Sequence, residues 1–101
     1  MPVKRTSSAA AKQLQVFWRG RVQGVGFRYT AETTALALKL VGWVRNLPDG
    51  RVEALCEGSE ARLKRFLEAM RTGPMRPYIQ DQQVTWGEAT GEFNDFTTRF
   101  Y

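Results

Sequence analysis

The chain has 101 residues, of which 43% are hydrophobic and 25% are charged, and this is enough for one domain with a modest core. Its formal net charge is +5, but Lys4, Arg5 and Lys12 carry three of these charges, so residues 13–101 carry only +2. This balance argues against a nucleic-acid partner, because nucleic-acid binders crowd basic side chains onto one face.

Residues 1–12 are rich in Ser, Ala and Lys and show no apolar periodicity. We therefore expect a flexible N-terminal arm, followed by a domain that covers residues 13–101. The arm lacks the apolar centre of a secretory signal, and no apolar stretch approaches the ~18 residues of a membrane span. Cys56 is the single cysteine, which excludes an internal disulfide and a multi-cysteine metal site. These features favour a cytoplasmic location without a membrane partner.

The first predicted elements flank a glycine-rich segment. Leu14, Val16 and Trp18 occupy every second position, which predicts a half-buried strand. Three glycines follow within residues 20–26. After them, an apolar stripe at helical spacing predicts a helix. The stripe consists of Phe27, Ala31, Ala35 and Leu38.

Two strands and a tight turn come next. Residues 42–46 and 51–57 are predicted strands, and Leu47-Pro48-Asp49-Gly50 between them is a strong hairpin signal. In the second strand, Val52 and Cys56 lie on the same face. We therefore interpret Cys56 as a small core residue.

A second helix and two further strands complete the chain. Ser59 is a favoured N-cap residue, and Gly73-Pro74 predicts the end of the helix that it starts. The apolar stripe of this helix consists of Leu63, Phe66, Leu67 and Met70. Residues 83–88 predict another strand, and the apolar positions in 96–100 predict a short last strand.

The predicted order of elements is βαββαβ plus a short extra C-terminal strand. Each helix separates two strands, and right-handed crossovers place both helices on the same face of the sheet. The predicted fold is therefore α+β, a ferredoxin-like α/β sandwich with two helices on one face of an antiparallel sheet. This fold alone leaves the function open, because catalytic, regulatory and RNA-binding domains share it.

The glycine-rich segment has the properties of an anion-binding loop. Glycines ahead of a helix N-terminus allow several backbone N–H groups to point into one concavity, where an anion is favoured. Arg28 adds a planar donor fork that suits a phosphoryl group. The predicted phosphate-binding loop consists of Gln23, Gly24, Val25, Gly26, Phe27 and Arg28. The alternative is that the glycines only shape a tight turn; neither the Walker nor the dinucleotide motif fits the segment.

The residue types that are absent narrow the chemistry. The chain has no histidine, and residues 20–28 contain no carboxylate, hydroxyl or thiol side chain that could act as a nucleophile. We expect no metal and no other cofactor. A phosphatase of this composition must use water directly and expel a weakly basic leaving group, such as the carboxylate of an acyl phosphate. Asn46 could orient that water with its amide, or it could merely support the adjacent turn.

Two separate motifs carry a family resemblance. Gly20-Arg21-Val22-Gln23-Gly24-Val25-Gly26-Phe27-Arg28 resembles a signature of the acylphosphatase family. Gly42-Trp43-Val44-Arg45-Asn46, followed by Asp49-Gly50-Arg51-Val52, is similar to the other signature of that family. The resemblance extends from about Leu14 to Tyr101.

The resemblance implies a ferredoxin-like fold and a reaction. Arg28 matches the family's phosphate-binding arginine, and Asn46 matches its water-orienting asparagine. The implied activity is hydrolysis of the carboxyl–phosphate bond of small acyl phosphates to a carboxylate and inorganic phosphate, and we expect a monomer. The alternatives are a non-catalytic module that binds anions or RNA, with Tyr29 and Trp43 stacking on bases, and a regulatory module that has lost turnover.

A few positions depart from the family pattern. Lys39 stands where a helix-ending glycine is frequent, which predicts a first helix without a favoured left-handed C-cap. Gln82 and Thr98 occupy positions that are usually apolar in relatives. Arg76 and Pro77 alter the stretch between the second helix and the strand around Val84.

Overall fold

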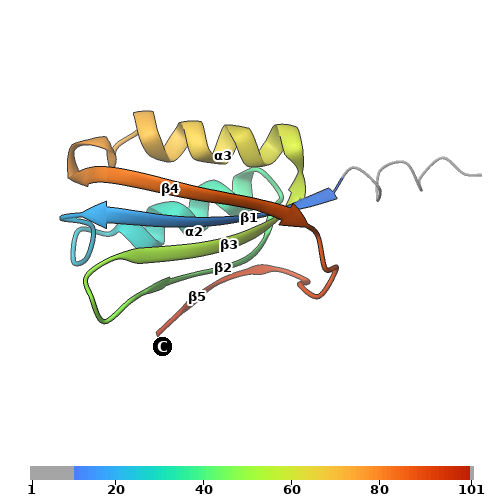
Figure 1. Cartoon of the computed structure of the whole chain (residues 1–101), viewed down its shortest axis with the longest axis horizontal. Helices are drawn as coiled ribbons and strands as arrows, with labels where there is room; N and C mark the ends of the chain where they lie inside the picture. The colour runs from blue at the N-terminus through green and yellow to red at the C-terminus, as the bar shows by residue number, and fades with distance from the viewer. Residues whose placement is uncertain (1–10, 101) are drawn as a thin grey trace, which may run out of the picture.

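The computed structural model describes residues 11–100. It confirms the predicted α+β, ferredoxin-like sandwich, in which two helices pack on one sheet (Figure 1). The elements are, in chain order, β1 (Ala11–Gly20), α2 (Phe27–Ala37), β2 (Val41–Asn46), β3 (Val52–Ser59), α3 (Glu60–Thr72), the short 3-10 helix η1 (Arg76–Tyr78), β4 (Ile79–Glu88) and β5 (Phe96–Arg99).

The five strands are arranged in the order β4-β1-β3-β2-β5. The pairs β4-β1, β1-β3 and β3-β2 are antiparallel. The pair of β2 with β5 is parallel, with Gly42 opposite Phe96 and Arg45 opposite Arg99. Residues 89–95 reverse the chain and carry it from one edge of the sheet to the other (Figure 1). The last strand therefore makes the sheet mixed rather than wholly antiparallel, and it brings the end of β5 beside the end of β2.

Trp18, near the end of β1, joins both helices to the sheet. Its ring packs edge-on against Phe27 of α2 and Phe66 of α3, with ring centroids 5.0 and 6.1 Å apart. Such aromatic pairs contribute about 0.5–1.5 kcal/mol beyond the burial of their surface. The indole Nε1 donates to Gln82 Oε1 at 2.7 Å. Gln82 thus satisfies a polar group of the core, which gives its amide a structural role.

Two strands begin earlier than predicted. β1 starts at Ala11, which lies opposite Ser59, so Ala11 and Lys12 belong to the sheet and not to the predicted arm. The remainder of that arm, residues 1–10, lies outside the described residues. β4 starts at Ile79, four residues before the predicted strand. Residues 80–83 are all polar and therefore gave no strand pattern in the sequence. They are nevertheless part of the strand, because an edge strand exposes many of its side chains.

The helix ends follow from local chemistry. Ser59 caps α3 as predicted, and its Oγ accepts a hydrogen bond from the Arg62 N–H at 3.2 Å. After α2, Lys39 adopts a left-handed φ of 58°. The Leu40 N–H donates to Ala35 O at 2.9 Å and the Lys39 N–H to Leu36 O at 3.0 Å, which is a Schellman cap. The expectation that this helix lacks a left-handed cap is therefore wrong: the cap forms with lysine, at a cost of about 1–2 kcal/mol.

Candidate functional site

Three segments meet at one end of the sheet. The glycine-rich loop after β1, the turn that joins β2 to β3 and the C-terminal end of β5 all lie at the left-hand end of the molecule in Figure 1. They enclose a cavity of about 350 Å³, the size of a small-molecule site. The cavity is lined by Val22, Gly24, Gly26, Phe27, Arg28, Tyr29, Glu32, Asn46, Thr98 and Phe100.

The glycine-rich loop enters α2 through two left-handed residues. Gly24 has φ 80° and Gly26, the N-cap, has φ 79°, conformations that residues with a side chain rarely adopt. The first intrahelical hydrogen bond runs from the Thr30 N–H to Gly26 O at 3.0 Å. Within residues 11–100, no protein group accepts a hydrogen bond from the backbone N–H groups of residues 23–28. The positive end of the helix dipole and these free donors favour an anion.

Gln23 and Val25 have side chains that serve the fold rather than the cavity. The Gln23 amide donates to Leu47 O at 2.8 Å and to Arg51 O at 3.0 Å, so it links the loop to the β2–β3 turn. The Val25 side chain packs against the hydrophobic core. Of these two predicted loop residues, only the backbone remains available to a ligand.

The C-terminal segment holds the Arg28 side chain. Its Nη1 donates to Arg99 O at 3.2 Å, and its guanidinium lies 4.8 Å from the centre of the Phe100 ring. The guanidinium has five N–H donors. One of them donates to the Arg99 carbonyl, and the others remain available to a ligand. Arg28 therefore combines a fixed position with free donors toward the cavity.

Asn46 ends β2 and lines the same cavity as Arg28. Among the described residues, its side-chain amide has no hydrogen-bond partner. The adjacent turn is held instead by Asp49, whose carboxylate accepts from the Arg51 N–H at 3.1 Å and from Arg51 Nε at 2.8 Å. The hydrogen bond from the Arg51 backbone holds the pKa of Asp49 below its usual value. Asp49 thus has its predicted role as a turn residue, and the Asn46 side chain does not support the turn.

Sequence reasoning missed several residues of the cavity. Glu32 lies four positions after Arg28 on α2, so helical spacing could have placed both on one face. Thr98 and Phe100 could not be placed in this way, because they reach the cavity only through the parallel pairing of β5 with β2. No local signal in the sequence specifies that pairing.

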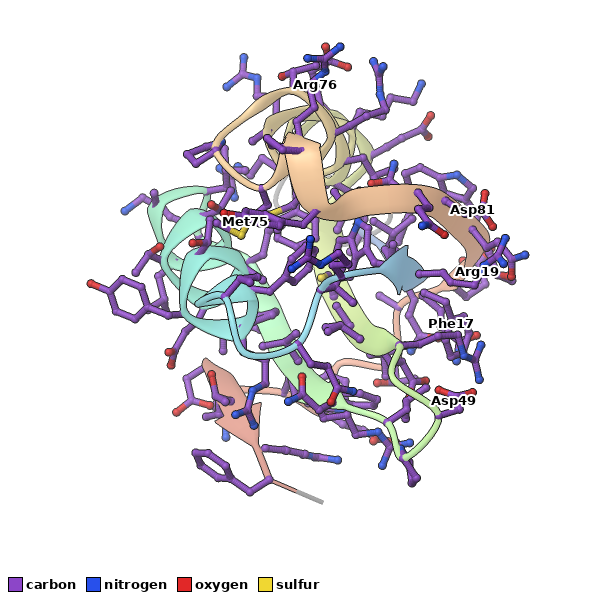
Figure 2. All side chains as sticks on the ribbon, turned by 90° about the vertical axis from the view of Figure 1, so that its left-hand side faces the viewer. Phe17, Arg19, Asp49, Met75, Arg76 and Asp81 are labelled. Carbon is purple, nitrogen blue, oxygen red and sulfur yellow. The ribbon has the colours of Figure 1, made fainter. Side chains whose placement is uncertain are left out.

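The two aromatic residues of the RNA-binding alternative lie apart. Tyr29 is exposed and lines the cavity, but Trp43 lies on the sheet face opposite the helices, 8% exposed. The guanidiniums of Arg45 and Arg99 lie 4.9 and 4.8 Å from the Trp43 ring centre. Figure 2 shows Phe17, also on this face, pointing away from α2. Trp43 therefore does not line the cavity with Tyr29, and two guanidinium groups cover its ring, so the expectation that both rings stack on bases at one site is wrong.

Cys56 is buried, and burial raises the pKa of its thiol far above the usual value, so it is a core residue as predicted. No group of three or more His, Cys, Asp or Glu residues that could hold a metal ion occurs in residues 11–100. In the same part of the chain, neither helix has the length and apolarity needed to cross a membrane.

Known proteins resemble the chain over nearly this whole domain. Residues 14–98 match the family model for acylphosphatase. Acylphosphatase from Trichormus variabilis is 48% identical over 79 residues, which is 78% of this chain and 78% of the relative. Acylphosphatase from Thermus thermophilus is 47% identical over 73 residues, covering 72% of this chain and 83% of the relative.

Structural similarity agrees with the sequence. The crystal structure of acylphosphatase from Bacillus subtilis matches with a TM-score of 0.82 and 41% identity, over 87% of this chain and 98% of that one. The resemblance inferred from the two motifs is thereby confirmed. The chain belongs to the acylphosphatase family, the hydrolases of acyl phosphates.

Proposed function

We propose that this acylphosphatase cleaves small acyl phosphates by direct attack of water, with Arg28 and the loop N–H groups binding the phosphoryl group and Asn46 orienting the water. The observation that carries the proposal is the shared cavity. Its lining includes Arg28 and Asn46, whose side-chain amide has no hydrogen-bond partner in residues 11–100, beside the N-terminus of α2. The phosphate-binding loop is Gln23 to Arg28, with Gln23 and Val25 contributing through the backbone.

The reaction needs little covalent help from the protein. The water oxygen attacks phosphorus, the bond between phosphorus and the acyl oxygen breaks, and the bonding electrons leave with the carboxylate. One proton of the water remains with the phosphate, and the other is released to solvent or to a phosphate oxygen. A carboxylate leaves without protonation, because the pKa of its conjugate acid is about 4–5. Positioning and charge stabilisation are then the main requirements.

Each site residue meets one of these requirements. The donors of Arg28 and of the loop neutralise the charge that builds up on the phosphoryl oxygens, and one such donor commonly contributes about 2.7–4 kcal/mol. The Asn46 amide has a donor and an acceptor, so it can hold water in a fixed orientation. Because Arg28 is already held by Arg99 O and Phe100, it needs little reorganisation on binding.

Phosphate release from acetyl phosphate and benzoyl phosphate tests the proposal. We expect rapid release that persists in EDTA, and little release from an alkyl phosphate, whose alkoxide leaving group would need an acid or a metal. Activity that disappears in EDTA and returns with Mg²⁺ would contradict the mechanism. Phosphate binding without release would instead favour the non-catalytic module.

We further propose that the protein acts as a cytoplasmic monomer without a nucleic-acid or membrane partner. One chain supplies every residue that lines the cavity, so no second copy is needed to complete it. The location rests on the single cysteine, Cys56, which allows no internal disulfide. Light scattering on the purified protein should give a mass near 11.5 kDa, and a dimer mass would contradict the proposal.

A further inference from the structure

The cavity continues beyond the groups that the proposed mechanism uses. Besides Arg28 and Asn46, its lining includes two exposed aromatic side chains, a threonine hydroxyl and a carboxylate. The rings are those of Tyr29 and Phe100, which are 70% and 82% exposed. Thr98, on β5, and Glu32, on α2, supply the two polar groups.

Glu32 is held in place by β5. Thr98 Oγ1 donates to Glu32 Oε1 at 3.2 Å, which occupies the only proton of the hydroxyl. Within residues 11–100, no Lys or Arg nitrogen lies within 4.0 Å of the Glu32 carboxylate, and Arg28 is no exception. The second carboxylate oxygen therefore remains available to a ligand.

A carboxylate in an anion-binding cavity opposes the ligand that the cavity binds. Its charge repels an anion that is bound in the same cavity. The repulsion is offset only if another part of the ligand brings a donor or a positive charge to the carboxylate. For an acyl phosphate, that part is the acyl group.

The spacing along α2 places Glu32 close to Arg28. Glu32 follows Arg28 by four residues, so their Cβ atoms are about 5–6 Å apart and on the same helix face. The methyl of an acetyl group offers Glu32 no hydrogen-bond donor. A larger acyl group that ends in a donor offers one, and its apolar body can pack against Tyr29 and Phe100, which line the same cavity.

We infer that Glu32, oriented by Thr98 and flanked by Tyr29 and Phe100, forms a subsite for the acyl group that selects acyl phosphates with an ammonium or another N–H donor at the far end. The subsite disfavours acyl groups that end in a carboxylate. This inference rests on the proposed function, since it assigns the substrate class of the same cavity.

Three benzoyl phosphates that differ only at the para position test the inference: aminomethyl, methyl and carboxylate. The value of kcat/KM for each is divided by its rate of hydrolysis without enzyme, which removes differences in leaving-group reactivity. We expect the wild-type protein to favour the cation over the neutral compound about tenfold, and the neutral compound over the carboxylate by a similar factor.

Variants at Glu32 should then change this order. Glu32→Gln keeps an acceptor for Thr98, and the normalised kcat/KM values of the three compounds should then lie within about twofold of one another. Glu32→Lys should reverse their order. Glu92→Gln removes the same charge from an exposed residue outside the cavity and should leave the order unchanged. With acetyl phosphate, whose methyl group offers Glu32 no donor, Glu32→Gln should change kcat/KM much less than it changes the preference for the cation.

The possible failures are distinguishable. If the wild-type protein releases phosphate from none of the compounds, the proposed function is wrong. If it hydrolyses all three and Glu32→Gln or Glu32→Lys leaves their order unchanged, the subsite is wrong and the proposed function stands. An equal loss for all three compounds in Glu32→Gln would also overturn the inference, because Glu32 would then act on the phosphoryl group or on the fold.

Discussion

Polar groups lie at both ends of the sheet, but their partners differ. At the end opposite the cavity, Glu57 of β3 is 3% exposed, and its carboxylate accepts four hydrogen bonds. The donors are Gln13 Nε2, the Thr90 N–H, Thr90 Oγ1 and the Gly91 N–H, at 2.8–3.0 Å. At the cavity end, the Asn46 amide and the loop N–H groups have no protein partner within residues 11–100.

The difference separates groups that stabilise the fold from groups that await a ligand. Three of these hydrogen bonds, those from Thr90 and Gly91, fix the segment that turns the chain from β4 toward β5. The unpaired donors and acceptors at the cavity do not stabilise the fold through hydrogen bonds. Such groups are expected where a ligand supplies the missing partners. Substitutions at the two ends should therefore affect different quantities: activity at the cavity end and stability at the Glu57 end.

Arg28→Ala should have the largest effect. Because Arg28 contacts the phosphoryl group in the substrate, the transition state and the product, its loss should lower kcat/KM by roughly 10³- to 10⁵-fold and also weaken inhibition by inorganic phosphate. Arg28→Lys should restore little, since a point charge cannot replace the planar fork. Kinetics with acetyl phosphate measure both effects. Arg62→Ala, an exposed arginine of α3, is the control and should leave them unchanged.

Asn46→Ala should lower kcat by about 10²- to 10³-fold while phosphate inhibits almost normally. An oriented water matters only on the way to the transition state, so the loss should fall on kcat and not on ground-state binding. Asn46→Asp keeps the shape but adds negative charge, and we expect it to be nearly inactive. Asn94→Ala, in an exposed loop, controls for the substitution itself. If Asn46→Ala loses phosphate affinity as severely as Arg28→Ala, Asn46 is a binding residue and does not orient water.

That Arg28 and Asn46 lie at one cavity could be predicted from the sequence because each lies in a short contiguous motif, whereas their roles stay predictions. Arg28 follows the glycine-rich loop directly, and Asn46 immediately precedes a turn whose residues specify a hairpin. Ser59 was predictable for the same reason, since an N-cap acts only on the next turn of helix. The motif did not show that Gln23 would link the loop to the turn, because that contact depends on the tertiary structure.

The features that escaped prediction depend on distant pairing. Thr98 and Phe100 reach the cavity because β5 pairs with β2, a strand about fifty residues earlier in the chain. The polar start of β4 resembled a loop because only tertiary pairing with β1 makes it a strand. Position 39 carries lysine and not the glycine that usually marks a left-handed cap, so residue type gave no sign of the cap that the Leu40 N–H and the buried Leu40 side chain complete.

Glu57→Gln should lower stability without lowering activity. The amide presents an NH₂ group to donors that now meet a carboxylate, so at least one buried donor loses its partner, at a cost of about 1–3 kcal/mol. For a domain of this size, the melting temperature should fall by roughly 5–15 °C. At temperatures well below the transition, kcat/KM should match the wild-type value, and Glu92→Gln should change neither quantity. A loss of kcat/KM in fully folded Glu57→Gln would contradict the separation of the two ends.

The effect of Glu57→Gln should also depend on pH. Burial tends to raise the pKa of Glu57, but the hydrogen bonds from Thr90, Gln13 and Gly91 outweigh it and hold the pKa below the usual 4.5. A lowered pKa in the folded state contributes stability that is present above the unfolded pKa and is lost as the pH falls through the folded pKa. The difference in melting temperature from wild type should therefore be constant from about pH 6 to 8 and should narrow below about pH 4.5.

Lys39→Gly should give the smallest effect, and of the opposite sign. Lys39 holds a φ of 58°, where a side chain is strained and glycine is not, so the substitution should raise stability by about 1 kcal/mol. Lys39 does not line the cavity, so kcat/KM should stay unchanged. Lys39→Ala removes the same charge and keeps a Cβ, and it should therefore leave the melting temperature close to that of wild type. If alanine stabilised the protein as much as glycine, the gain would come from the lost charge and not from relief of the backbone. A gain confined to glycine, with kcat/KM unchanged, would show that the stability of this helix end can be raised without any change at the cavity.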